Sequence, residues 1–81
     1  MGAVAWKLVT LMKQYGLRPL DIEREATRLG YPMGKNVIYR LVSEDGPQRI
    51  DRTTLTAIVA AIRSLTNSDI GVGDMLVFEE Y

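Results

Sequence analysis

The sequence contains no cysteine and no histidine. These residues build most disulfides and structural zinc sites, and they supply the usual thiol nucleophiles and imidazole bases. No serine or threonine lies in a G-x-S-x-G nucleophile motif either. We therefore expect no enzymatic activity, no bound metal and no cofactor.

Long hydrophobic runs are absent as well. The apolar stretches are far shorter than the roughly 20 residues that a membrane-spanning helix needs. The first residues, Met1–Lys7, lack the charged start and the cleavage site of a signal peptide. We expect no membrane partner and a cytoplasmic location.

The composition is that of an ordinary globular domain. The chain has 81 residues, of which 47% are hydrophobic and 25% are charged, and this is enough for one modest core. There is no internal repeat and no linker long enough to separate two domains. The sequence predicts a single domain spanning residues 1–81.

The charges are unevenly distributed, although the formal net charge is zero. Residues 1–40 carry seven Lys or Arg against three Asp or Glu, and residues 41–81 carry three against seven. A chain divided in this way can turn a basic half toward a polyanion and an acidic half away from it. A neutral total therefore does not exclude nucleic acid as a partner.

Apolar residues recur at helical spacing along most of the chain. The pattern predicts helices at about 4–15, 19–29, 35–42 and 52–66, a short helical turn at 71–76 and an extended tail at 77–81. The predicted fold class is all-α, a compact bundle of about five short helices.

Glycine, proline and aspartate mark the expected helix ends. Gly16 is placed to end the first helix in a left-handed conformation, and Pro19 suits the first turn of the second. The segment Gly30–Gly34 holds two Gly and one Pro and is predicted to be a turn. Asp51 is a favourable N-cap for the fourth helix.

The third predicted helix carries a strip of polar side chains that suits DNA. Its apolar residues, Ile38, Leu41 and Val42, anchor it from behind. Lys and Arg donate to guanine, Asn pairs with adenine, and Tyr reaches a phosphate or a thymine methyl. The candidate base-contacting residues are Lys35, Asn36, Tyr39 and Arg40.

Four segments carry a family resemblance. They are Leu8–Leu17 (LVTLMKQYGL), Asn36–Val42 (NVIYRLV), Ile50–Leu55 (IDRTTL) and Val72–Leu76 (VGDML). In this order they resemble the first helix and Gly turn, the recognition helix, the entry to helix four and the closing segment of the Cro/lambda-repressor-like (XRE-type) helix-turn-helix transcriptional regulators. The resemblance covers nearly the whole chain.

The resemblance implies roles for several basic residues. It places the strip of the third helix against the bases, and it places Arg18, Arg49 and Lys13 against phosphates. Two departures stand out. Arg18 and Pro19 occupy the start of the second helix, where the family has a small hydroxyl residue followed by Gln. The stretch Ala26–Lys35 is also longer than usual, which predicts a lengthened connection between helices two and three.

These observations predict a sequence-specific transcriptional regulator that inserts its third helix into the major groove of double-stranded DNA. One helix reads only a few base pairs, so we expect a homodimer on a palindromic site. The tail Leu76–Phe78 and the outer side of the fourth helix are candidate dimer surfaces. The alternative is a protein-interaction module, such as an antitoxin or accessory protein, that uses the same fold and works through its acidic half and apolar tail.

Plainer interpretations of the strip stay open at this point. Charged residues on a short helix are most often only its solvated face. Tyr39 can pack against the second helix with its hydroxyl in water, and Asn36 can serve as the N-cap of the third helix.

Overall fold

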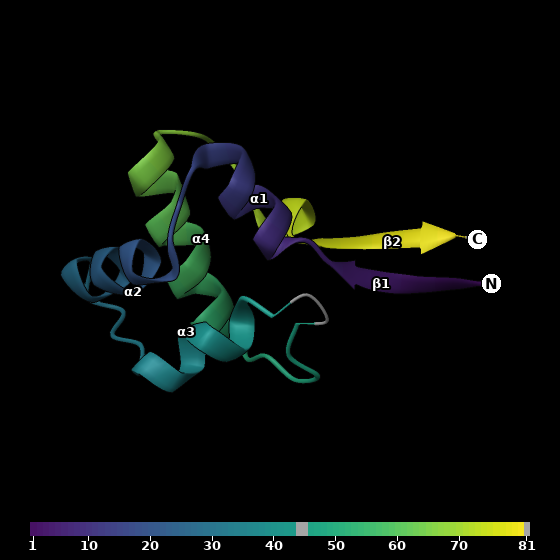
Figure 1. Cartoon of the computed structure of the whole chain (residues 1–81), viewed down its shortest axis with the longest axis horizontal. Helices are drawn as coiled ribbons and strands as arrows, with labels where there is room; N and C mark the ends of the chain where they lie inside the picture. Colours follow the sequence, from purple (N-terminus) through teal and green to yellow (C-terminus); the bar gives the residue numbers. More distant parts are fainter. Residues whose placement is uncertain (44–45, 81) are drawn as a thin grey trace.

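Four α-helices and a two-stranded antiparallel sheet form the part of the chain that the computed structural model describes, residues 1–43 and 46–80 (Figure 1). The elements in order are β1 (Gly2–Trp6), α1 (Leu8–Tyr15), α2 (Pro19–Arg28), α3 (Lys35–Leu41), α4 (Arg52–Thr66), the 3-10 turn η1 (Val72–Asp74) and β2 (Leu76–Glu80). The predicted all-α bundle of five helices is therefore wrong, because both ends of the chain form strands.

The first helix starts four residues later than expected. Val4 shares helical spacing with Leu8, but it lies in β1, opposite Phe78 of β2. The ladder runs from Gly2 opposite Glu80 to Trp6 opposite Leu76. Pairing with β2 satisfies the backbone groups along one edge of β1 through residues at the other end of the chain, and local hydrophobic periodicity does not reveal such a partner.

The C-terminal segment was also predicted in part incorrectly. The expected helical turn at 71–76 contracts to the three residues of η1. The tail is extended as predicted as far as Glu80, but it is paired to β1 rather than free. Met75, between the two elements, is fully buried as expected of a core residue.

The predicted helix boundaries elsewhere are confirmed. Gly16 ends α1 in the left-handed conformation, with φ of 67°, and Pro19 is the first residue of α2. The carboxylate of Asp51 accepts a hydrogen bond from the backbone N–H of Thr54 at 2.7 Å and caps α4. Asn67 ends α4, also in the left-handed conformation.

The connection between α2 and α3 is attached to the helical body at its start and near its end. The N–H of Tyr31 donates to the carbonyl of Ala26, and that of Gly30 to the carbonyl of Thr27, which together form a Schellman motif at the end of α2. Further along, Met33 packs against the core. The six residues from 29 to 34 thus hold α3 at a defined place beside α2.

The helices enclose one apolar core. α4 packs against α2, and α2 packs against α3. The largest fully buried side chains come from α1, α2, α3, α4 and the segment before β2: Leu8, Ile22, Ile38, Ile58, Ile62 and Met75. No helix in residues 1–43 and 46–80 is long and apolar enough to cross a membrane.

The two strands form a ribbon that projects from the helical body (Figure 1). The molecule measures 41 × 24 × 20 Å along its principal axes, and the ribbon lies along the longest. Only its base is tied to the body, because Trp6 packs against the core and the N–H of Lys7 donates to the carbonyl of Met75.

Candidate nucleic-acid interface

Helix α3 presents a polar strip and buries its opposite side. Asn36, Tyr39 and Arg40 are exposed, whereas Ile38 and Leu41 are buried in the core. Residues three and four apart share a helix face, so the three exposed side chains lie along one strip. Lys35 begins the helix, but its side chain lies outside the described part of the chain.

Two of the plainer interpretations do not fit this geometry. The N-cap of α3 is Gly34, and Asn36 is the second residue of the helix, so Asn36 does not cap it. Tyr39 is 56% exposed and makes no hydrogen bond with a described residue. Its ring is therefore available to a ligand rather than packed against α2.

A groove of about 800 Å³ runs from α3 to the start of α4. Ser43 and residues 46–50 line one side, and Asp51 and Thr54 line the end at α4. Its lining includes Tyr39, Arg40 and Arg49. The structure thus brings Arg49, a predicted phosphate contact, together with two predicted base contacts.

The described lining of this groove includes two arginines and one carboxylate. Arg40 and Arg49 are exposed and form no ion pair with any residue in the described ranges. Asp51 is the one carboxylate among the described lining residues. The backbone N–H of Thr54 donates to it and lowers the pKa of its carboxyl group. The carboxylate of Asp51 is therefore used to cap the N-terminus of α4.

The other predicted phosphate contacts lie outside the groove. Arg18 is the N-cap residue of α2, and its Nε lies 3.6 Å from the carboxylate of Asp21. Lys13 is exposed in the last turn of α1. Neither residue lines the groove, so the structure joins Arg49 to α3 and leaves Arg18 and Lys13 on separate helices.

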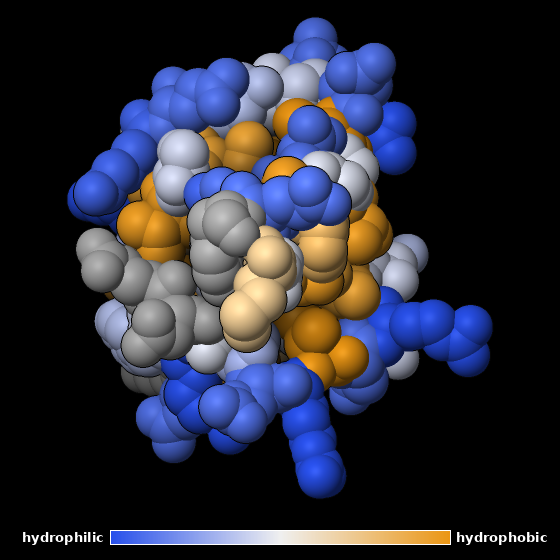
Figure 2. Space-filling view, turned by 90° about the vertical axis from the view of Figure 1, so that its right-hand side faces the viewer, coloured by the Kyte–Doolittle hydropathy of each residue, from blue (hydrophilic) through white to orange (hydrophobic). Residues whose placement is uncertain are grey.

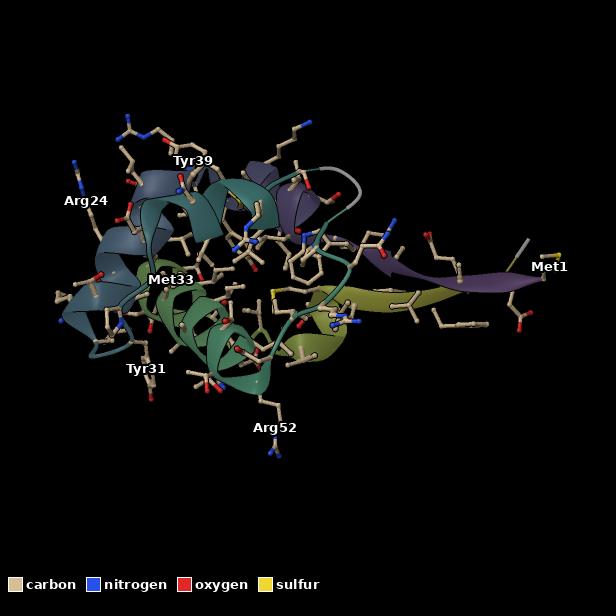
Figure 3. All side chains as sticks on the ribbon, turned by 90° about the horizontal axis from the view of Figure 1, so that it is seen from below. Met1, Arg24, Tyr31, Met33, Tyr39 and Arg52 are labelled. Carbon is tan, nitrogen blue, oxygen red and sulfur yellow. The ribbon has the colours of Figure 1, made fainter. Side chains whose placement is uncertain are left out.

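Arg24 is a basic residue that the sequence reasoning did not single out. It is exposed on α2 and forms no ion pair within the described ranges. Figure 3 shows Arg24 and Tyr39 on the same side of the molecule, with Arg52 pointing from the opposite side. Spacing alone gave no signal, because Arg24, like Arg18 and Arg28, has an acidic residue three positions away, and only the structure shows that Asp21 pairs with Arg18.

Comparison with protein-family models, with curated proteins and with solved structures identifies no match to this chain. The resemblance to the XRE-type regulators therefore stays a prediction from the four quoted segments.

Proposed function

We propose that this protein is a sequence-specific DNA-binding transcriptional regulator that inserts α3 into the major groove. The observation that carries the proposal is the groove in which Tyr39, Arg40 and Arg49 lie together beside the exposed strip of α3. A DNA reader needs such an arrangement, because side chains that read base edges must stand next to cations that hold the phosphates.

The side chains divide the work by their chemistry. Asn36 offers the bidentate amide that pairs with adenine, and Arg40 offers a guanidinium that fits guanine O6 and N7. Arg49, across the groove, is placed for the neighbouring phosphate. Lys35, Tyr39, Arg18 and Lys13 complete the proposed contact set.

A single α3 is too short to specify a regulatory site. Its seven residues span about 10 Å and can reach only a few base pairs. We therefore propose a homodimer on a palindromic site with half-sites about one helical turn apart. The proposal includes a cytoplasmic location and requires no cofactor.

Selection of bound sequences from random duplexes tests the proposal directly. We expect an enriched palindromic motif, which is then used to measure the affinity of variants. Arg40→Gln should weaken binding about 5- to 150-fold and relax the preference at one base pair, because each base contact contributes about 1–3 kcal/mol. Arg49→Gln should weaken binding to all duplexes alike.

Arg52→Gln is the matched control, since Arg52 is an exposed arginine that points from the side opposite Tyr39 (Figure 3). It should bind as the unsubstituted protein does. A selection that returns no motif, together with equal retention of Arg40→Gln and Arg52→Gln on DNA at low salt, would rule the proposal out.

One observation favours the alternative, a protein-interaction module. A groove of about 550 Å³ runs along the outer side of α4, with an apolar floor that includes Leu55 and Val59 and with Arg52 and Arg63 in its lining. This groove would accept an apolar segment that carries acidic residues. If the protein binds its partner through this groove, Val59→Glu should abolish partner binding and Arg40→Gln should leave it intact. If the protein is a DNA regulator, Arg40→Gln should weaken DNA binding and Val59→Glu should leave DNA binding intact.

A further inference from the structure

The projecting ribbon is left without a partner on most of its surface. Gly2, Ala3 and Val4 are exposed, Val4 at 64%, and Phe78 is 62% exposed. Figure 2 faces the end of the ribbon and shows apolar surface on this side of the molecule, with hydrophilic regions above and below it. An isolated two-stranded ribbon is only marginally stable in water. A ribbon of this kind therefore gains stability from any further strand.

The two faces of the ribbon differ in chemistry. Residues directly opposite in an antiparallel pair point to the same face, so Val4 and Phe78 share one face. The ring of Phe78 also reaches over Gly2, where an added Cβ would lie 2.3 Å from its Cζ. The other face carries the ion pair between Lys7 and Glu79, with 3.3 Å between Nζ and Oε2. The Val4 face thus carries the larger apolar side chains, with Glu80 at its outer end, and the other face carries the ion pair beside small or aliphatic residues, Ala3, Ala5 and Val77.

The two edges differ as well. β2 carries two carboxylates, Glu79 and Glu80, and charged side chains are a common protection of a free edge against further pairing. β1 carries no charge between Gly2 and Trp6, and within the described ranges β2 is the one strand paired with it. Self-association through β2 would bring four carboxylates together, whereas self-association through β1 would bring none. The open edge of β1 is therefore the one suited to pairing.

We propose that a second copy of this chain pairs its β1 antiparallel to β1 of the first, about a twofold axis at Val4. The four-stranded sheet has the order β2, β1, β1 of the second copy, β2 of the second copy. In this register four apolar side chains lie side by side on one face of the sheet. Their order is Phe78 and Val4 of the first copy, then Val4 and Phe78 of the second. Gly2 then lies opposite Trp6 of the second copy.

This interface goes further than the proposed function and does not depend on it. The interface consists of two five-residue β1 strands together with Val4 and Phe78 from each copy. We expect it to bury less than the roughly 1,200 Å² at the low end of standard protein–protein interfaces. The dimer should therefore dissociate at micromolar concentration. Since Trp6 of β1 is hydrogen-bonded to the end of α3, the dimer also sets how the two copies of α3 are oriented.

The absence of cysteine permits a direct test on the full chain without DNA. The matched variants are Val4→Cys and Phe78→Cys, which alter two almost equally exposed residues of one cross-strand pair. In the proposed sheet the two copies of position 4 are on adjacent strands, about 5 Å apart, and the two copies of position 78 are three spacings apart, about 14 Å. A bismaleimide shorter than three strand spacings should link the Val4→Cys protein into dimers and leave the Phe78→Cys protein monomeric.

Other outcomes overturn the proposal. Cross-linking of Phe78→Cys, alone or together with Val4→Cys, indicates pairing through β2 or packing face to face. No cross-linking of either variant indicates a monomer or a dimer formed through α4.

A second pair of variants separates loss of the interface from loss of the fold. Val4→Lys should raise the dimer dissociation constant at least tenfold in sedimentation, while Val4→Thr, which keeps the branched shape, should not. Both variants should retain the circular dichroism spectrum of the unsubstituted protein. Equal dissociation constants for the two would contradict the proposal.

Discussion

The indole N–H of Trp6 donates a hydrogen bond to the carbonyl oxygen of Leu41 at 2.6 Å. Leu41 is the last residue of α3, where helix carbonyls lack partners within the helix. The bond therefore satisfies a helix end and ties β1 to the proposed recognition helix. Residues 35 positions apart thus couple the ribbon to the polar strip of α3.

Replacing Trp6 by phenylalanine tests this link. The variant keeps an aromatic ring against the core but leaves the carbonyl of Leu41 without its partner. Because this carbonyl is partly buried, we expect a loss of about 1–2 kcal/mol in the free energy of unfolding, measured by urea denaturation. A variant as stable as the unsubstituted protein would show that the bond contributes nothing to stability.

Gly46 is predicted to be intolerant of a side chain for two reasons. Its φ is 71°, in the left-handed region, and an added Cβ would lie 2.4 Å from Cγ of Trp6. We expect Gly46→Ala to destabilise the protein by about 2–4 kcal/mol, from strain and overpacking together.

Two other glycines provide the controls for Gly46. Gly16 has φ of 67° but open space around it, so Gly16→Ala should show the strain alone, about 1–2 kcal/mol. Gly73 has open space and no left-handed φ, so its alanine variant should unfold like the unsubstituted protein. If the two variants lose the same free energy of unfolding in urea denaturation, the Trp6 side chain moves away from the added methyl group without destabilising the protein.

The Glu25 carboxylate is predicted to make stability depend on pH in acid. Nε and Nη2 of Arg28 donate to it at 2.7 Å each, and the hydroxyl of Ser64 on α4 donates to it as well. The hydrogen bonds from Arg28 and then from Ser64 lower the pKa of Glu25 from 4.5 to about 2. The stabilising contribution is complete above pH 4.5 and is lost as the pH falls toward 2, because the unfolded chain takes up the proton first.

Urea midpoints between pH 2 and 7 measure this effect. In the Glu25→Gln variant this part of the fall in stability between pH 4.5 and 2 should be missing. Its urea midpoint should therefore approach that of the unsubstituted protein near pH 2. Glu23→Gln is the matched control on the same helix, since Glu23 makes no hydrogen bond or ion pair with a described residue. If Glu25→Gln follows the same pH curve as the control, the link between α2 and α4 has no electrostatic part.

Arg24 is predicted to contact phosphate in the DNA complex. Because it lies on the side of Tyr39 without an ion pair to a described residue, Arg24→Gln should weaken binding severalfold for every duplex. The slope of log K against log salt should also become less steep by about one, since one fewer counterion is released. Salt titration of affinity measures both quantities. An unchanged slope would place Arg24 outside the interface.

Much of the helical part could be predicted because helix signals are local. The cap at Asp51 and the left-handed end at Gly16 each depend on bonds within a few residues. The exposed strip of α3 followed from the same periodicity, which places Ile38 and Leu41 in the core. The groove could not be predicted, because Arg40 and Arg49 meet only through the path of the chain between α3 and α4.

The sequence by itself determined, to within one residue, where α2, α3 and α4 begin and end and where α1 ends, and it determined which face of each helix is apolar. These properties arise from hydrogen bonds and spacings that close within one or two turns. Tertiary structure alone decided that Gly2–Trp6 is a strand, since its partner strand, Leu76–Glu80, lies at the opposite end of the chain. The residues of Gly2–Trp6 include one glycine and two alanines, which have little intrinsic preference for strands. It also decided which cations share a groove, because packing of α4 against α2 and of α2 against α3 places them in space.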